Sequence, residues 1–221
     1  MKTEIILEVN KLEKSFMGQN VIQDFSLVIR RGERVALCAP SGAGKTTLLR
    51  IIAGLEKLDA GSVRLEERST AVVFQEPRLF PFMTVEENIF LPFHVGNRKT
   101  DPTVYNRFQE WMDVCELAGY EKHYPWQLSG GMKQKTALVR ALLGCPAFLL
   151  MDEPFQSIGS QNKQEIIQYL LANHPEITVL FITHNQEEVP MLAHRVVYFQ
   201  QTRLSQALHL SAACFHTTLS Y

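Results

Sequence analysis

The sequence lacks the features that mark a membrane-spanning, secreted or nucleic-acid-binding chain. Its 221 residues contain no run of about 18 apolar residues, so no segment is expected to cross a membrane. The first residues show no apolar stretch of the kind found in signal peptides, and no such peptide is expected. The 22 basic and 23 acidic residues leave a formal net charge of −1, which gives no indication of nucleic acid as a partner.

Cysteine is scarce and dispersed. The four cysteines lie far apart and form no C-x-x-C pair: Cys38, Cys115, Cys145 and Cys214. This spacing argues against a disulfide framework and a zinc site and favours a reducing cytosol. Apolar residues make up 46% and charged residues 20% of the chain, which are ordinary proportions for a globular protein. The length allows one large domain or two small ones.

Apolar periodicity predicts a strand-rich first part and an alternation of strands and helices in the last third. Strands are predicted at residues 4–9, 21–29, 35–38, 63–65, 71–74, 148–151, 178–182 and 195–199. Helices are predicted at residues 46–53, 102–119, 132–143, 163–172 and 186–193. Thr84-Val85-Glu86-Glu87 has the sequence of a capping box, and Asp101-Pro102 that of a helix start.

Because parallel strands need crossover connections, this alternation indicates a parallel α/β core. We predict a single domain, residues 1–221, with a core formed by residues 1–75 and 141–221. Residues 76–140 are predicted to form a helical insertion. Near the C-terminus, helical spacing predicts a short amphipathic helix that docks on the core through Leu204, Ala207, Leu208, Ala212 and Phe215.

A glycine-rich segment lies between an apolar strand and an amphipathic helix: Ser41-Gly42-Ala43-Gly44-Lys45-Thr46-Thr47. Glycines let consecutive N–H groups point at phosphate oxygens, and the helix N-terminus adds partial positive charge. Lys45 is expected to reach the β- and γ-phosphates, and the Thr46 hydroxyl to hold Mg²⁺. Ala39 occupies the first glycine position of the G-x-x-x-x-G-K-[ST] pattern. The flanking strand and helix favour a phosphate-binding loop over a merely structural turn.

A strand that ends in two acids supplies the second part of the expected site. Asp152 and Glu153 follow the apolar run 148–151. Ligands of parallel α/β sheets bind at the carboxyl ends of strands, so Asp152 is expected to face the Mg²⁺ held by Thr46. Glu153 is placed to orient and deprotonate an attacking water. Two solvated acids after a core strand are the alternative, which the phosphate-binding loop disfavours.

A second anion-binding sequence, Leu128-Ser129-Gly130-Gly131, opens the predicted helix 132–143. Ser129 has the properties of both an N-cap and a phosphate donor. An ordinary helix start explains this segment equally well if it stands alone. If the segment binds an anion, either the chain holds two anions or the segment completes a nucleotide bound to another copy.

The order of these motifs resembles that of an ABC transporter ATPase subunit. The resemblance covers residues 5 to about 199 and includes Lys45-Thr46, Gln75 after Val72-Val73-Phe74, the Ser129-Gly130-Gly131 signature, Leu150-Met151-Asp152-Glu153-Pro154 and Thr183-His184. It implies a P-loop NTPase core with a parallel sheet, an N-terminal antiparallel β subdomain and an inserted helical subdomain. It also implies a head-to-tail dimer in which each ATP lies between one phosphate loop and the partner's signature.

The resemblance also assigns roles. It implies that Phe16 stacks on adenine, although a core position is the alternative for a lone aromatic. Gln75 would sense Mg²⁺ and the attacking water, His184 would hydrogen-bond the γ-phosphate, and Glu153 would be the general base. The candidate catalytic residues are Glu153, His184, Gln75 and Lys45; the ATP-binding residues are Phe16, Ser41, Gly42, Ala43, Gly44, Lys45, Thr46, Thr47, Ser129, Gly130 and Gly131; the Mg²⁺ ligands are Thr46, Gln75 and Asp152.

Two positions depart from the family pattern. Ala39 is tolerated if its φ is negative and strained otherwise. Gly159 ends the segment Gln156-Ser157-Ile158-Gly159, where the family has aspartate, so a carboxylate expected at the dimer interface is lost. This loss is expected to weaken cooperation between the two ATP sites.

The resemblance implies the ATPase of an ABC importer, a homodimer on the inner face of the cell membrane. Its partners would be ATP, Mg²⁺, membrane permease subunits and, indirectly, a solute-binding protein. The stretch from Gln75 to Asn88 resembles the nitrate, sulfonate, taurine and thiamine-precursor importer group. The alternatives are an exporter or lipoprotein-extraction ATPase, and a soluble ABC ATPase of translation or DNA repair. A small-molecule P-loop kinase is disfavoured because the signature would then have no role.

Overall fold

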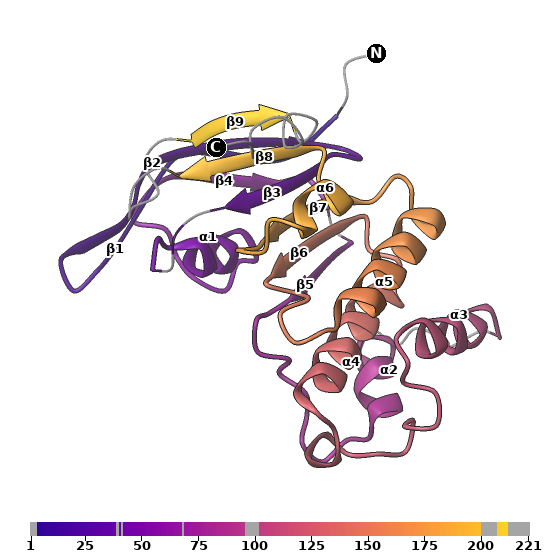
Figure 1. Ribbon diagram of the computed structural model, residues 1–221. Coiled ribbons are helices and arrows are strands. Elements are labelled where there is room, and N and C mark those ends of the chain that lie inside the picture. The colour runs from indigo at the N-terminus through magenta and orange to yellow at the C-terminus, as the bar shows by residue number, and fades with distance from the viewer. Residues whose placement is uncertain are drawn as a thin grey trace. The chain divides into compact units, whose positions relative to one another are not determined.

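A computed structural model describes residues 4–38, 40, 42–67, 69–95, 102–199 and 207–211 (Figure 1). The chain divides into two compact units. The first comprises Met1–Thr70, Ala147–Glu153 and Glu176–Tyr221, and the second Ala71–Pro146 and Pro154–Pro175. Residues 71–75, 141–146 and 154–175, which the sequence prediction gave to the core, fall in the second unit.

The first unit begins with an antiparallel sheet of order β2-β1-β4, in which β1 is Ile5–Phe16, β2 Gln19–Arg30 and β4 Ala60–Leu65. Phe25, Leu27 and Ile29 alternate with exposed residues along β2, as predicted. Both hairpin strands extend beyond the predicted strands and run up to a tight turn at Met17 and Gly18. These two residues have φ of 48° and 77°. Two successive positive φ values form the tight turn that matches the twist of paired strands.

The strands of the second sheet that lie in the first unit have the order β6-β7-β3-β8-β9. They are β3 (Arg34–Cys38), β6 (Phe148–Asp152), β7 (Thr178–Ile182), β8 (Arg195–Phe199) and β9 (Ala207–Ser211). β6, β7, β3 and β8 pair in parallel, which confirms the predicted parallel core. Every residue of β6 and β7 is buried, as expected for strands covered on both faces. Helices α1 (Lys45–Ile52) and α6 (Glu188–Leu192) belong to the same unit.

The C-terminal prediction was wrong. Residues 207–211 form β9, antiparallel to β8, rather than a helix docked on the core. Leu208 and Leu210 alternate with less apolar residues, a strand pattern, and pairing gives the backbone of β8 hydrogen-bond partners along an otherwise free edge. Leu204, Ala212 and Phe215 lie outside the described residues.

Among its described residues, the second unit has the α-helices α2 (Val85–Val95), α3 (Pro102–Val114), α4 (Gly130–Leu142) and α5 (Ser160–Asn173). A short 3₁₀ helix spans Pro125–Gln127, and strand β5 (Thr70–Val73) runs into this unit from the first. The predicted capping box of α2 is present, since Thr84 and Glu87 each accept a hydrogen bond from the other's backbone N–H. Asp101, the predicted N-cap of α3, lies outside the described residues.

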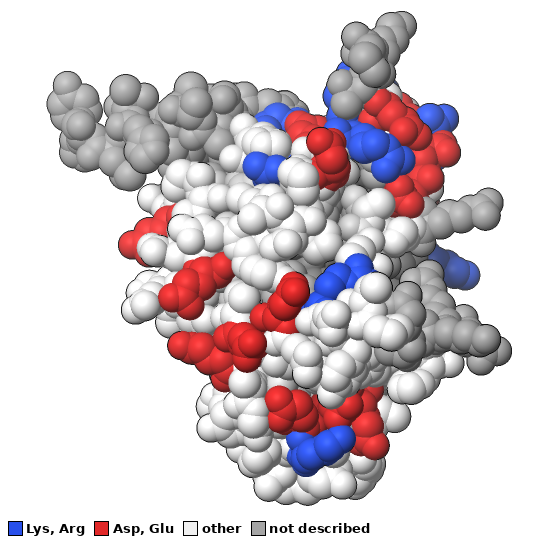
Figure 2. All heavy atoms as spheres, turned by 90° about the vertical axis from the view of Figure 1, so that its right-hand side faces the viewer, with Lys and Arg blue, Asp and Glu red and all other residues white. Residues whose placement is uncertain are grey.

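Aromatic side chains form much of the packing within this helical unit. The Phe90 ring on α2 lies 5.0 Å from that of Phe108 on α3, and Trp111 meets Tyr169 of α5 edge-on at 4.7 Å. Among the described residues, no helix has the length and apolar character needed to cross a bilayer. The surface viewed in Figure 2 carries interspersed acidic and basic side chains, in keeping with the balanced composition.

Candidate functional site

The predicted phosphate-binding loop connects β3 to α1 in the first unit. Gly42 and Gly44 have φ of 77° and 89°, a backbone region that favours glycine. A Cβ on Gly44 would lie 2.7 Å from Val21 Cγ1 and 3.0 Å from the Val21 carbonyl oxygen, so β2 packs directly against the loop. Ala43 is fully buried, and Thr47 lies in the first turn of α1. Ala39 and Ser41 lie outside the described residues, so the φ of Ala39 stays a prediction.

Lys45 and Thr46 face the acidic end of β6. The Thr46 hydroxyl donates a 2.6 Å hydrogen bond to Asp152 Oδ2. Lys45 is buried, and its Nζ donates to the Pro40 carbonyl oxygen at 2.8 Å. Burial lowers the pKa of Lys45, while the charges of Glu153 and Asp152 act in the opposite direction. The loop and the acidic pair therefore meet as predicted.

Asp152 is buried, and this burial raises the pKa of its carboxyl group; the Thr46 hydrogen bond opposes the shift and the charge of Glu153 adds to it. A buried carboxylate next to a hydroxyl oxygen is a donor set that Mg²⁺ prefers. A divalent cation would offset the cost of keeping Asp152 charged in this position. The residues present thus fit the predicted metal.

Glu153 follows β6 with an unusual backbone conformation. Its φ is 45°, which costs a residue other than glycine about 1–3 kcal/mol. Its backbone N–H is fixed by the Ile182 carbonyl oxygen at 2.9 Å. Oε2 is buried and lies 2.8 Å from His184 Nδ1, but the two groups are not aligned for a hydrogen bond. Oε2 therefore has no hydrogen-bond partner among the described residues and points toward an exposed imidazole.

The loop that carries His184 is fixed by a residue that sequence reasoning missed. Glu188 is buried at the start of α6 and accepts a 2.6 Å hydrogen bond from the Thr183 hydroxyl. Thr183 Oγ1 in turn accepts from the Asn185 backbone N–H at 3.0 Å. The sequence offered one signal for Glu188, an acid beside the apolar residues of a short helix. Its hydrogen-bond partner, Thr183, can be seen only in the structure.

Phe16 ends β1 beside the hairpin turn. The residue is 43% exposed, so it does not lie in the core, which was the alternative considered for it. The Lys14 ammonium lies over one face of the ring, with Nζ 4.9 Å from the ring centroid. Sequence reasoning did not single out Lys14, because the strand was predicted to end at residue 9, before both Lys14 and Phe16.

The second unit holds the signature sequence and Gln75. Ser129 is the N-cap of α4, and its hydroxyl accepts a 3.2 Å hydrogen bond from the Met132 N–H. Gly130 and Gly131 form the first turn of the helix. A Cβ on Gly131 would lie 2.5 Å from the Ser157 carbonyl oxygen, so the loop before α5 packs on the signature where only glycine fits.

Gln75 lies close to the same loop. Its exposed side-chain amide donates to Gln156 Oε1 at 3.3 Å, and the preceding residue, Phe74, accepts a weak 3.4 Å hydrogen bond from Gln134 of α4. Gly159 is the N-cap of α5, and a Cβ added there would meet nothing within 4 Å. A larger side chain would therefore have room at this position.

Comparison with known proteins identifies the family. A sequence profile described as ABC transporter matches residues 22–156, more than half of the chain. The chain belongs to this family. The sulfate/thiosulfate import ATP-binding protein CysA of Salmonella typhi is 41% identical over 216 residues, covering 91% of this chain and 59% of the relative. Its counterpart in Mesorhizobium japonicum is 40% identical over 215 residues, covering 90% and 62%. The chain thus spans about three fifths of the length of these curated relatives.

Solved structures show the same fold. The dimeric structure of a post-hydrolysis state of the ATP-binding cassette MJ0796 bound to ADP and Pi superposes with a TM-score of 0.82 at 26% identity. The match covers 94% of this chain and 99% of that one. A second dimeric MJ0796 structure matches equally well, at 27% identity. The predicted fold class, an ABC ATPase fold with parallel and antiparallel sheets, is therefore confirmed.

Proposed function

We propose that the chain is the ATP-hydrolysing subunit of an ABC importer. The observation that carries this proposal is the 2.6 Å hydrogen bond between Thr46 of the phosphate loop and the buried Asp152, with buried Lys45 beside them. Phosphoryl transfer needs positioning and charge neutralisation more than covalent chemistry, and these three side chains supply both.

Each residue of the loop has a part in binding. The loop N–H groups from Gly42 to Thr47 and the N-terminus of α1 hold the phosphates. The ammonium of Lys45 exchanges the Pro40 carbonyl for the β- and γ-phosphate oxygens. Thr46 and Asp152 would hold Mg²⁺, which would neutralise phosphate charge when bound.

Glu153 acts as the general base. Its buried Oε2 lacks a hydrogen bond within the described part of the chain and is available to accept a proton from the attacking water. The Nδ1 atom of His184 lies 2.8 Å from Glu153 Oε2, and the side chain is exposed. As the resemblance implies, its imidazole would hydrogen-bond the γ-phosphate. Phe16 provides an exposed ring for the adenine base.

The proposed assembly is a head-to-tail homodimer. Ser129, Gly130 and Gly131 of one copy complete the ATP site of the other, since a helix N-terminus with a serine hydroxyl binds anions. The MJ0796 structures that resemble this chain are described as dimeric, which supports a dimer. ATP binding closes the dimer and hydrolysis reopens it, and the helical unit transmits the motion to permease subunits on the inner face of the membrane.

The importer assignment is supported by the relatives, which are named as import ATP-binding proteins. For the solute we propose the nitrate, sulfonate, taurine and thiamine-precursor group, which the stretch from Gln75 to Asn88 resembles. Sulfate or thiosulfate is a second candidate, because relatives at 40–41% identity carry that name. A solute-binding protein would deliver either kind of solute to the permease.

Phosphate release by the purified chain tests the enzymatic part. We expect hydrolysis of ATP that requires Mg²⁺ and falls about 100-fold or more in Lys45→Ala, because a charged phosphate contact is lost. Lys57→Ala changes an exposed lysine of the first unit and should hydrolyse ATP like the wild type. Hydrolysis that is unaffected by Lys45→Ala would refute the site.

Co-purification from solubilised membranes tests the transport part. The permease captured with the chain is reconstituted in vesicles, and ATP-dependent uptake of nitrate, taurine and sulfate is compared. Uptake of sulfate alone would replace the first solute group by the second. Export instead of uptake, or the absence of any captured permease, would contradict the importer assignment.

A further inference from the structure

Lys14 is a buried lysine near the end of strand β1. It is 7% exposed, and its Nζ is 3.1 Å from Asp59 Oδ1 and 3.2 Å from Glu56 Oε1. Burial alone would lower the pKa of Lys14, but the hydrogen bonds and charges of Asp59 and Glu56 outweigh it and raise the pKa. The ammonium is therefore a fixed positive charge held by two carboxylates.

The same ammonium lies against the Phe16 ring. Its distance of 4.9 Å from the ring centroid is within the range of a cation–π contact. Because Lys14 occupies one face of Phe16, the opposite face is the one left for a stacking partner. The exposed fraction of 43% shows that the ring still offers surface to such a partner.

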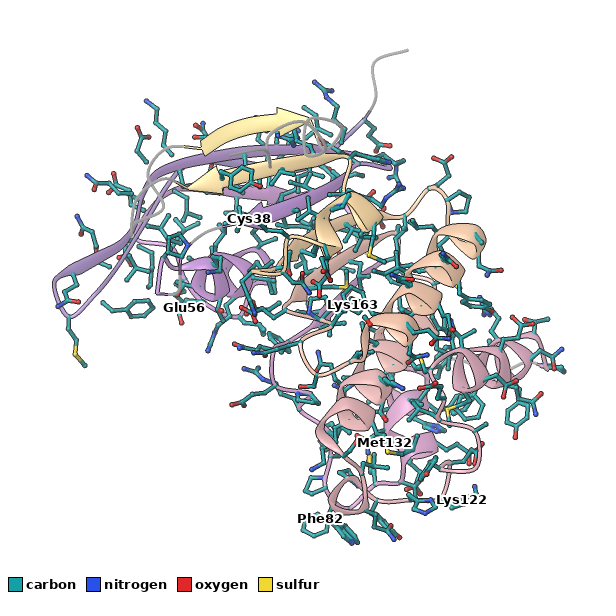
Figure 3. The ribbon with its side chains drawn as sticks, in the orientation of Figure 1. Cys38, Glu56, Phe82, Lys122, Met132 and Lys163 are labelled. Atoms are coloured by element: carbon teal, nitrogen blue, oxygen red, sulfur yellow. The ribbon has the colours of Figure 1, made fainter. Side chains whose placement is uncertain are left out.

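Backbone hydrogen bonds fix the strand that carries both residues. Asp59 Oδ2 accepts from the Ser15 N–H at 2.6 Å, and the Asp59 N–H donates to the Glu13 carbonyl oxygen at 2.9 Å. The segment after α1 is thus tied to the end of β1. Figure 3 shows Glu56 below α1, beside the hairpin formed by β1 and β2.

The hairpin is also tied to the phosphate loop. Phe16 pairs with Gln19 across the turn, and two residues later Val21 packs against Gly44 so closely that a Cβ there would clash. The hairpin that carries the aromatic ring therefore packs against the phosphate loop within the first unit.

From these contacts we infer that Lys14 is a positioning residue for nucleotide binding, which holds the Phe16 ring in place for the base of ATP. This inference rests on the proposed function, since it assigns a task to the same ATP site. A ring that is fixed before binding loses less conformational freedom when the base stacks on it. The ion pairs with Asp59 and Glu56 keep the ammonium under the ring.

Equilibrium binding of two Mg²⁺-bound probes to the full chain tests the inference: ATP, and inorganic tripolyphosphate, which has the phosphates without the base. Lys14→Met keeps the apolar stem and removes the charge. We expect its Kd for ATP to rise about three- to tenfold, with the Kd for tripolyphosphate unchanged. Lys14→Arg, which keeps the charge, should bind ATP like the wild type, as should Lys57→Met.

A double-mutant cycle asks whether Lys14 acts through the ring. In a Phe16→Ala background, Lys14→Met should cause no further loss of ATP affinity. Asp59→Asn provides a second variant in case Lys14→Met does not fold, because it loosens the ammonium and can still accept from the Ser15 N–H. It should show the same loss for ATP alone.

The outcomes separate this inference from the proposed function. Equal losses for both probes, additive effects in the cycle, or wild-type ATP affinity in Lys14→Met would overturn the positioning role. If the wild type binds both probes with equal affinity, the base contributes nothing, and the roles of Phe16 and Lys14 fall while the phosphate site stands. If the wild type binds neither probe, the proposed function itself fails.

Discussion

Glu153 combines a strained backbone with a buried carboxylate oxygen that lies 2.8 Å from His184 Nδ1 without forming a hydrogen bond. Its φ of 45° is held by the hydrogen bond from its N–H to Ile182, and its Oε2 has no hydrogen-bond partner in the part of the chain that the structure describes. Each feature costs free energy of folding, and neither contributes to packing. Residues with such unfavourable features are common at functional sites, which supports the proposed role of Glu153 as the general base.

Glu153→Gln is expected to bind ATP with nearly wild-type affinity and to lose almost all hydrolysis. The amide keeps the size of the side chain and one acceptor oxygen, but it replaces the other oxygen by an NH2 donor and cannot accept the proton of the attacking water. A fall in phosphate release of about 100- to 10,000-fold is expected from the loss of a general base. Phosphate release and ATP binding are measured on the same preparation.

The matched control for this variant is Glu187→Gln, which changes an exposed acid in the loop that follows β7. It should hydrolyse ATP at the wild-type rate. Hydrolysis by Glu153→Gln at a similar rate would remove Glu153 from the mechanism, whereas loss of ATP binding would assign it a structural role.

At the scale of elements, local signals predicted most strands and helices, and the failures have physical causes. The strand-to-loop-to-helix order around Lys45 is encoded by contiguous residues, and α1 appears within one residue of its prediction. The strands of the β1–β2 hairpin were predicted too short. The turn between them was not recognised, because it contains Met17, and methionine is uncommon at a turn position with positive φ. The helix predicted over residues 204–215 was wrong because the free edge of β8, a tertiary feature, pairs with β9.

The candidate site likewise contains residues that could be predicted from the sequence and residues that could not. Lys45, Thr46, Asp152 and Glu153 occur in short motifs whose residue types disclose their chemistry, so they could be predicted. Lys14 and Glu188 act through partners 45 and five residues away, Asp59 and Thr183. A single sequence contains no sign of such pairs, because contact depends on the folded path of the chain.

Two adjacent glycines of α4 give a matched test of how the signature packs. A Cβ on Gly131 would lie 2.5 Å from the Ser157 carbonyl oxygen, whereas a Cβ on Gly130 meets nothing within 4 Å. Gly131→Ala should therefore destabilise the protein by about 1–3 kcal/mol through overpacking. Gly130→Ala should be neutral or stabilise it by up to about 1 kcal/mol.

Urea unfolding without nucleotide measures both free energies of unfolding. The prediction concerns the order of the two variants, since they share a helix turn and differ only in what surrounds the added methyl group. Equal stabilities would mean that the loop before α5 moves away at little cost.

The end of α5 gives a prediction about pH. His174 follows the helix, and its half-buried imidazole has a pKa below its ordinary value, first because of burial and second because of the positive charge of Arg107. The unfolded chain therefore takes up this proton at a higher pH than the folded chain. The stability contributed by neutral His174 is fully present above about pH 6.5 and is lost as the pH falls below it.

We expect the urea midpoint of the wild type to fall between pH 7.5 and pH 5.5, and that of His174→Gln to fall less. The backbone bond from residue 174 to the Leu170 carbonyl oxygen is retained in the variant, so the cap of α5 is preserved. An equal fall in both proteins would show that His174 does not contribute to this pH dependence.

At the scale of the whole molecule, one chain has a complete phosphate loop and a complete signature, and the proposal assigns them to two different ATP sites of a dimer. Lys45→Ala should disable the loop and Ser129→Arg the signature, so each variant alone should be nearly inactive. In a mixed dimer, the intact loop of the Ser129→Arg chain meets the intact signature of the Lys45→Ala chain. One complete site is thereby restored, and the other carries both defects.

Random pairing gives mixed dimers in half of the population, each with one of its two sites intact, so about a quarter of the wild-type rate is expected if the sites act independently. Gly159 favours such independence if, as the resemblance implies, an aspartate at this position would lie at the dimer interface. A mixture of Lys45→Ala with the double variant Lys45→Ala/Ser129→Arg contains no complete site and is the matched control. Phosphate release no faster than in that control would contradict sharing of the site between copies, because each chain would then need its own signature to hydrolyse ATP.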